Sequence, residues 1–210
     1  MTDNRVEKEK ILRFTQEKFI NEGFYKTTMD EIASELQMSK KTIYKHFPSK
    51  EKLVEEISED FITCATTDLD EIINSRENVI VKFVKLLNMY SSRMMRHSDK
   101  WYRDLQLHTP QIWIKVDKFR TERILSIVKI LLEQGRKEKL IEPYPPEIII
   151  TSFISTVRAI VNPEFILRNK FSMQEAFKYT FEMLLNGILT EQGKEKYLKT
   201  KKLLETEVKR

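Results

Sequence analysis

The side chains best suited to chemistry in this chain of 210 residues lie close together, between residues 39 and 50. The run SKKTIYKHFPSK places lysines, hydroxyls, a tyrosine and a histidine within about three helical turns. From Leu36 to Leu53 there are five lysines against one glutamate. Lysine donates hydrogen bonds to guanine O6 and N7 and to phosphates, while threonine and tyrosine contact phosphates or thymine methyls. This chemistry predicts an interface for double-stranded DNA.

Two short predicted helices position these groups. Thr28 and Glu31 have the spacing of a capping box, which starts a helix. Its apolar residues recur at helical spacing, at Met29, Ile32, Ala33 and Leu36. Ser39 is a good N-cap for a second helix over residues 40–47, which Ile43 and Phe47 anchor inward. The pair forms a predicted helix-turn-helix, whose second helix presents its N-terminal residues to the major groove.

The same stretch resembles the DNA-binding signature of the TetR/AcrR family of bacterial transcriptional regulators. The residues that carry the resemblance are Gly23, Phe24, Thr27, Thr28, Ile32, Ala33, Ser39, Lys40, the run 43–47 and the run 49–53. The resemblance covers about residues 8–55, and the rest of the chain agrees with the family in length and helical pattern only. One departure is Lys41, because many members have a glycine there that lets the recognition helix approach DNA closely.

Nine residues form the predicted DNA interface. They are Thr28, Ser39, Lys40, Lys41, Thr42, Tyr44, Lys45, His46 and Lys50. Lys40, Lys41 and Thr42 begin the recognition helix and are placed to read base edges. The resemblance implies that the family's phosphate-binding tyrosine, histidine and helix-start lysine correspond to Tyr44, His46 and Lys50.

Composition favours an all-α protein, since glycine and proline number only four and six. We expect a helix-turn-helix domain over 1–52 and a helical effector-binding and dimerisation domain over 53–210, joined through a helix from residue 50 to about 74. Further helices are predicted at about 7–22, 78–97, 100–107, 109–139, 146–162 and 172–189, with a lysine-rich solvated helix in the last residues.

Several protein classes fit this sequence poorly. It has no apolar run of the roughly 20 residues that span a bilayer and no signal-peptide core, so we expect a cytoplasmic protein with no membrane partner. The single cysteine, Cys64, excludes an intramolecular disulfide, and we interpret it as a packing residue. No phosphate loop, nucleophile elbow or metal motif is present, so we predict no enzyme, no cofactor and no metal site.

The helices over 146–162 and 172–189 carry apolar groups on most sides and predict a four-helix bundle with a second copy, as the resemblance also implies. The predicted dimer interface comprises Phe153, Val157, Arg158, Met173, Phe177, Thr180, Phe181, Leu184 and Ile188. Arg158 either pairs with an acid across the dimer or faces an anionic ligand. A dimer in turn predicts a pseudo-palindromic operator.

A pocket for a small, largely apolar effector is predicted from large amphipathic side chains and from the family's habit of binding ligands among these helices. Its residues are Phe61, Tyr90, Met94, Trp101, Tyr102, His108, Trp113, Phe153 and Val157. The same pattern also fits an ordinary core. The sequence thus predicts a homodimeric repressor released from its operator by such an effector. The alternatives are an all-helical interaction protein and a regulator controlled by a protein partner.

Overall fold

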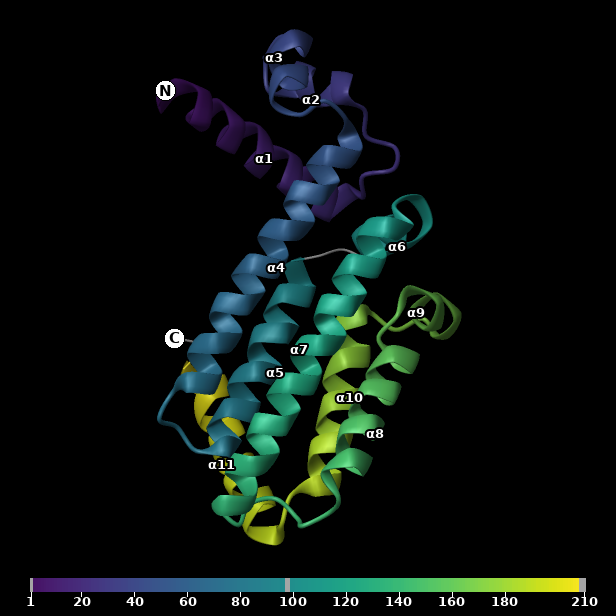
Figure 1. The fold of residues 1–210 in the computed structure, drawn as a ribbon. Coiled ribbons are helices and arrows are strands. Elements are labelled where there is room, and N and C mark those ends of the chain that lie inside the picture. Colours follow the sequence, from purple (N-terminus) through teal and green to yellow (C-terminus); the bar gives the residue numbers. More distant parts are fainter. Residues whose placement is uncertain (1, 97–98, 208–210) are drawn as a thin grey trace. The chain divides into compact units, whose positions relative to one another are not determined.

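The computed structural model describes residues 2–96 and 99–207, and its regular elements there are α-helices, apart from one isolated bridge between Ile141 and Leu189. The helices are α1 (Thr2–Glu22), α2 (Met29–Glu35), α3 (Lys40–His46), α4 (Lys50–Asn74), α5 (Val79–Arg96), α6 (Asp99–His108), α7 (Pro110–Lys137), α8 (Pro146–Ile160), α9 (Pro163–Asn169), α10 (Met173–Ile188) and α11 (Glu191–Glu207) (Figure 1). The all-α class is confirmed, whereas α9 was not predicted.

Local signals in the sequence set several helix ends. Gly23 follows α1 with φ +82°, and its N–H donates to the Phe19 carbonyl at 3.0 Å. The predicted capping box at α2 is present: the Glu31 N–H donates to Thr28 Oγ1 at 3.2 Å, and Glu31 Oε2 accepts from the Thr28 N–H at 2.7 Å. Ser39 Oγ accepts from the backbone N–H of Thr42 at 3.0 Å, which caps α3. The end of α1 and the starts of α2 and α3 are therefore fixed by contacts within four residues.

The chain forms two compact units, whose bounds differ from the predicted division after residue 52. The first unit comprises Met1–Ala65 and Arg96–Lys118, and the second comprises Thr66–Met95 and Phe119–Arg210. Helices α4 and α7 each contribute residues to both units. Helix α6 and the start of α7 join the first unit because their apolar side chains complete its core.

The core of the first unit is built around Trp101 of α6, which is 1% exposed. Its ring lies 6.5 Å from the Phe19 ring, 5.5 Å from the Phe24 ring and 5.9 Å from the Phe61 ring, measured between centroids. Because aromatic side chains bury the largest areas, this cluster joins α1, α4 and α6 into one body. Helices α2 and α3 pack on the same core through Ile32 and Ile43, among others.

The second unit has its own core, formed by side chains from α4, α5, α7, α8, α10 and α11. Helices α8 and α10 lie side by side (Figure 1). Among the described residues, no single helix is long and apolar enough to span a membrane, although α8 and α9 together, bent by 60°, meet the same test of length and composition.

Candidate nucleic-acid interface

Helix α3 is held by two buried side chains, and its lysines and tyrosine are presented to solvent. Ile43 and Phe47 are fully buried, on the inward side. Lys41 and Lys45 are exposed, and Tyr44 is 46% exposed despite its large ring. The face of α3 that can meet a ligand therefore carries two ammonium groups and a phenol hydroxyl, a set that suits phosphates and base edges.

The first turn of α3 is ordered by short hydrogen bonds. The hydroxyls of Ser39 and Thr42 share a hydrogen bond of 2.8 Å. Lys40 Nζ donates to Asp30 Oδ2 at 2.6 Å, and this hydrogen bond raises the pKa of the lysine. Both side chains of the pair are mostly exposed, so DNA can replace the carboxylate at small cost.

Two of the predicted DNA contacts turn inward instead. The His46 side chain is only 4% exposed, and its Nε2 lies 3.2 Å from Glu7 Oε2 of α1. Lys50 Nζ donates to the carbonyl oxygens of Phe24, Tyr25 and Thr27 at 3.0, 2.8 and 2.9 Å. The phosphate role that the resemblance implied for these two residues is therefore not supported by their geometry.

The other seven predicted residues remain at the surface of α2 and α3 or at their caps. They are Thr28, Ser39, Lys40, Lys41, Thr42, Tyr44 and Lys45. Sequence reasoning missed Asp104 of α6, which is 6% exposed and whose Oδ2 accepts from the Tyr25 N–H at 2.9 Å. An acidic residue 79 positions away from its partner leaves no local signal in the sequence.

The predicted pocket residues are divided between the two units. Phe61, Trp101, Tyr102, His108 and Trp113 belong to the first unit, and Tyr90, Phe153 and Val157 belong to the second. The His108 ring stacks on the Tyr25 ring at 3.6 Å. In the second unit, the rings of Tyr90 and Phe177 are 5.1 Å apart. The Met94 side chain lies outside the described residues.

Most of the predicted dimer contacts pack inside the protomer. Phe153, Val157, Met173, Phe177, Thr180 and Ile188 are buried, and Phe181 and Leu184 are partly buried against the core of the second unit. Arg158 alone among the nine is exposed. In each helix, the face that packs against the protomer's own core thus contains most of the residues that were predicted to face a partner.

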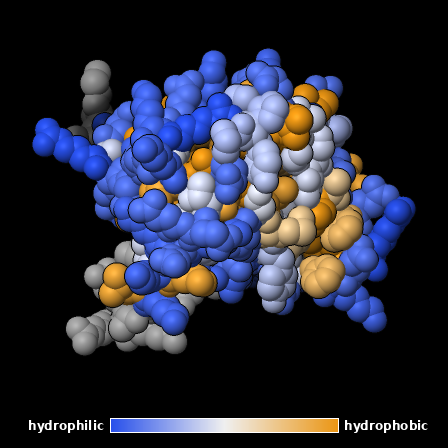
Figure 2. Space-filling view, turned by 90° about the horizontal axis from the view of Figure 1, so that it is seen from below, coloured by the Kyte–Doolittle hydropathy of each residue, from blue (hydrophilic) through white to orange (hydrophobic). Residues whose placement is uncertain are grey.

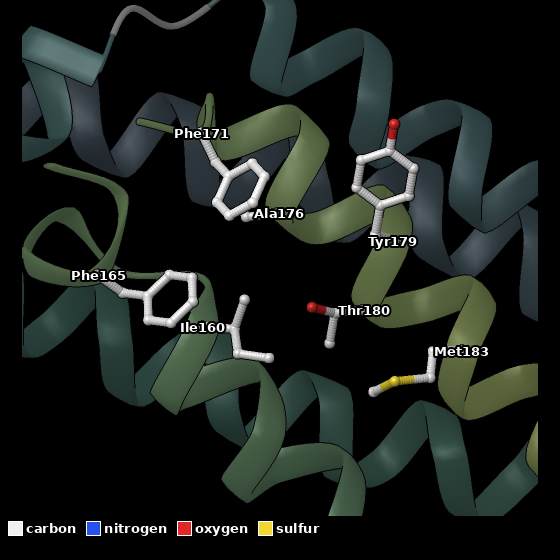
Figure 3. A pocket seen from close by; sticks show the side chains of 7 residues that line it. All are labelled: Ile160, Phe165, Phe171, Ala176, Tyr179, Thr180 and Met183. Atoms are coloured by element: carbon white, nitrogen blue, oxygen red, sulfur yellow. The ribbon is translucent and has the colours of Figure 1, made fainter. Parts of the chain in front are cut away.

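A different set of apolar residues on the second unit is exposed. Ile148 of α8 and Tyr179 and Met183 of α10 are 62%, 59% and 60% exposed. A group of apolar side chains lies at the right of Figure 2, the side on which α8 and α10 lie in Figure 1. An open apolar cavity of about 200 Å³ lies between α8, α9 and α10, and its lining side chains are drawn in Figure 3: Ile160, Phe165, Phe171, Ala176, Tyr179, Thr180 and Met183.

Comparisons with known proteins agree with this arrangement. Residues 11–57 match the family described as bacterial regulatory proteins, tetR family. The chain is 26% identical over 176 residues to the HTH-type transcriptional regulator YvaF of Bacillus subtilis (strain 168), covering 83% of this chain and 92% of that protein. A TetR-family regulator from Marinobacter aquaeolei VT8 shares the fold with a TM-score of 0.71 at 19% identity, covering 93% of this chain and 97% of that one. A transcriptional regulator from Cytophaga hutchinsonii ATCC 33406 has a TM-score of 0.69 at 22% identity, covering 87% and 98% of the two chains.

Proposed function

Since the chain is a DNA-binding transcriptional regulator of the TetR family, we propose that it acts as a homodimeric repressor, which binds a pseudo-palindromic operator and is released by a small apolar effector. The observation that carries the proposal is the outward face of α3. Buried Ile43 and Phe47 fix the helix, and Lys41, Tyr44 and Lys45 are left exposed for DNA. Such an arrangement lets a short helix enter the major groove without unfolding its own unit.

Within this proposal, the residues divide by role. Lys40, Lys41 and Thr42 begin α3 and read base edges, because the N-terminal part of a recognition helix goes deepest into the groove, whereas the hydroxyl of Tyr44 contacts a phosphate. Thr28, Ser39 and Lys45 contact phosphates. Binding to bases makes affinity depend on sequence, whereas binding to phosphates makes it depend on salt.

The test of operator binding is selection of duplexes from a random DNA library by the purified protein at physiological salt. The proposal expects a short pseudo-palindrome whose half-sites lie about one helical turn apart. Binding that is sensitive to salt but blind to sequence would contradict it.

Two substitutions then separate the roles. Lys41→Met should cost about 1–3 kcal/mol on the selected operator and little on unrelated duplexes. Lys45→Met should weaken binding to all duplexes and reduce the salt slope by about one per half-site. Lys129→Met, at an exposed position of α7 in the second unit, is the matched control and should leave both quantities unchanged. Equal losses on all duplexes for Lys41→Met would remove its base-reading role.

Dimerisation is proposed through the exposed face of α8 and α10 rather than through the buried residues first predicted. Ile148, Arg158, Tyr179 and Met183 lie on these two helices and are exposed. Apolar side chains exposed in one protomer are stabilised by burial against a second copy. The helices then supply the four-helix bundle that the apolar pattern predicted.

A cytoplasmic location is proposed as well, because the proposed target is DNA in a bacterial cell.

The effector is proposed to bind in the second unit. Tyr90, Phe153 and Val157 lie in that unit, where aromatic rings such as those of Tyr90 and Phe177 line a largely apolar interior. An effector releases the operator only if it binds the non-binding state more tightly. Screening apolar compounds for release of a labelled operator tests this, and failure across the screen favours control by a protein partner.

A further inference from the structure

Lys50 is the first residue of α4, and its side chain is hydrogen-bonded to the backbone of the same chain. Its ammonium group donates to three backbone carbonyls, those of Phe24, Tyr25 and Thr27, at 2.8–3.0 Å. An ammonium group has three N–H donors, so these carbonyls use all of them. A phosphate could gain a bond from Lys50 only if one of these bonds were broken.

The same segment is also held by Asp104 of α6. Asp104 is 6% exposed, and its Oδ2 accepts a hydrogen bond from the Tyr25 N–H at 2.9 Å. Gly23 allows this approach, since a Cβ there would lie 2.6 Å from the same oxygen. One cation and one anion, from two different helices, therefore hold residues 23–27.

The charges of the two groups support each other. Burial lowers the pKa of Lys50, whereas the nearby carboxylates of Asp104 and Glu31 act in the opposite direction. A partly buried ammonium group is costly unless it is hydrogen-bonded, and the three backbone carbonyls meet this condition while the two carboxylates add favourable electrostatics. Removing either group leaves the other in a less favourable environment.

The held segment leads directly into the DNA-reading helices. Thr27 is buried and donates from its hydroxyl to the Gly23 carbonyl at 3.4 Å, and the next residue, Thr28, caps α2. Helix α2 packs on α3, so the path of residues 23–27 fixes where α2 starts and thereby how α3 is presented. Neither Lys50 nor Asp104 needs to touch DNA to affect its recognition.

We propose that Lys50 and Asp104 are positioning residues for DNA reading, which clamp residues 23–27 and hold α2 and α3 in the orientation that fits the operator. The inference rests on the proposed operator binding, and it replaces the phosphate contact expected for Lys50. Helix α6 acts through Asp104 as a support of the recognition helix.

The experiment combines amide hydrogen exchange of residues 24–28, measured without DNA, with operator affinity measured over a range of salt concentrations. The variants are Lys50→Met, Lys50→Arg and Asp104→Asn, all studied where circular dichroism shows them folded. Lys52→Met is the matched control, because it removes the same charge two residues along α4, where Lys52 binds Glu55 instead. Lys45→Met is the reference for a lost phosphate contact.

Lys50→Met and Asp104→Asn should each accelerate exchange in 24–28 and weaken operator binding by about tenfold or more, with the salt slope unchanged. Lys50→Arg should recover much of the affinity, because it retains N–H donors that methionine, which preserves only the apolar stem, lacks. Lys52→Met should leave exchange in this segment unchanged.

A salt slope reduced by about one per half-site in Lys50→Met, with exchange in 24–28 unchanged, would show a phosphate contact and overturn the clamp. Unchanged exchange and affinity in Asp104→Asn would overturn the role of α6. If the unmodified protein selects no operator, the proposed function fails and the DNA-reading role fails with it. The exchange data would still show whether residues 24–28 are clamped.

Discussion

Gly23→Ala should destabilise the first unit strongly, although it adds only one methyl group. Gly23 has φ +82°, and the left-handed region costs an L-residue about 1–2 kcal/mol. The new Cβ would also lie 2.6 Å from Asp104 Oδ2 and 3.3 Å from Lys100 Cβ. The first of these distances is shorter than real Cβ contacts, so the Asp104 carboxylate must move.

Movement of Asp104 weakens its hydrogen bond from the Tyr25 N–H, now 2.9 Å long. Loss of a hydrogen bond to a charged group costs about 1.5–3 kcal/mol. With the backbone cost, the expected loss is about 2.5–5 kcal/mol in the free energy of unfolding. This is a large part of the roughly 5–15 kcal/mol that stabilises a typical domain.

Tryptophan fluorescence during urea unfolding measures this loss where it occurs, because both tryptophans, Trp101 and Trp113, belong to the first unit. The comparison variant is Gly187→Ala in α10, where a Cβ would have no neighbour within 4 Å. Alanine in a helix is favoured over glycine, so this change should be neutral or stabilising by up to about 1 kcal/mol. A free energy of unfolding for Gly23→Ala within about 0.5 kcal/mol of the unmodified protein would refute the argument.

Three further changes test other parts of the structure. Trp101→Ala removes the centre of the first core and should cost about 3–5 kcal/mol, measured by circular dichroism in urea; a loss below 1 kcal/mol would contradict the packing described. Hydrogen bonds from Lys52 and then Lys115 lower the pKa of Glu55 to about 2, so its stabilising effect is complete above its ordinary pKa of 4.5 and is lost as the pH falls towards 2. Thermal melts should therefore show Glu55→Gln slightly less stable than the unmodified protein at pH 6, with the difference vanishing near pH 2; a constant difference would exclude this linkage. Met183→Glu places a charge on the proposed dimer face and should shift the protein towards monomer by at least about tenfold in sedimentation equilibrium, and an unchanged dimer would place the interface elsewhere.

The parts of the fold that could be predicted depend on contacts within a few residues. The capping box predicted at Thr28 is present, and Ser172 forms another at the start of the helix predicted from residue 172, because each box joins residues three apart. The start of α9 carries a similar signal, since Asn162 accepts from the Phe165 N–H and a proline follows it. The signal was missed because Asn162 was taken as the last residue of the helix predicted over 146–162, whereas α8 ends at Ile160 and Asn162 caps the next helix.

The predictions that failed depend on which side of a helix packs inward. Periodicity identified α8 and α10 as apolar on most sides, but it could not distinguish Phe153 and Phe177, which are buried, from Ile148 and Met183, which are exposed. Likewise, the sequence predicted Trp101 as a pocket residue, whereas its side chain is buried in the core of the first unit. The side of a helix that packs inward is set by contacts with residues far apart in the sequence, so it could not be predicted from this single sequence.

The number of lysines near the recognition helix likewise does not show how many of them are able to bind DNA. The sequence places five lysines there, and each one that neutralises a phosphate adds about 0.9 to the salt slope. The structure commits Lys50 to carbonyls, pairs Lys52 with a glutamate and pairs Lys40 with an aspartate. Lys41 and Lys45 are exposed outside these acid pairs, and Lys40 can exchange its partner for DNA. The proposed operator binding therefore predicts two or three lysine contacts per half-site around α3 rather than five, with a larger share of the affinity coming from base reading and from the accurate placement of α3.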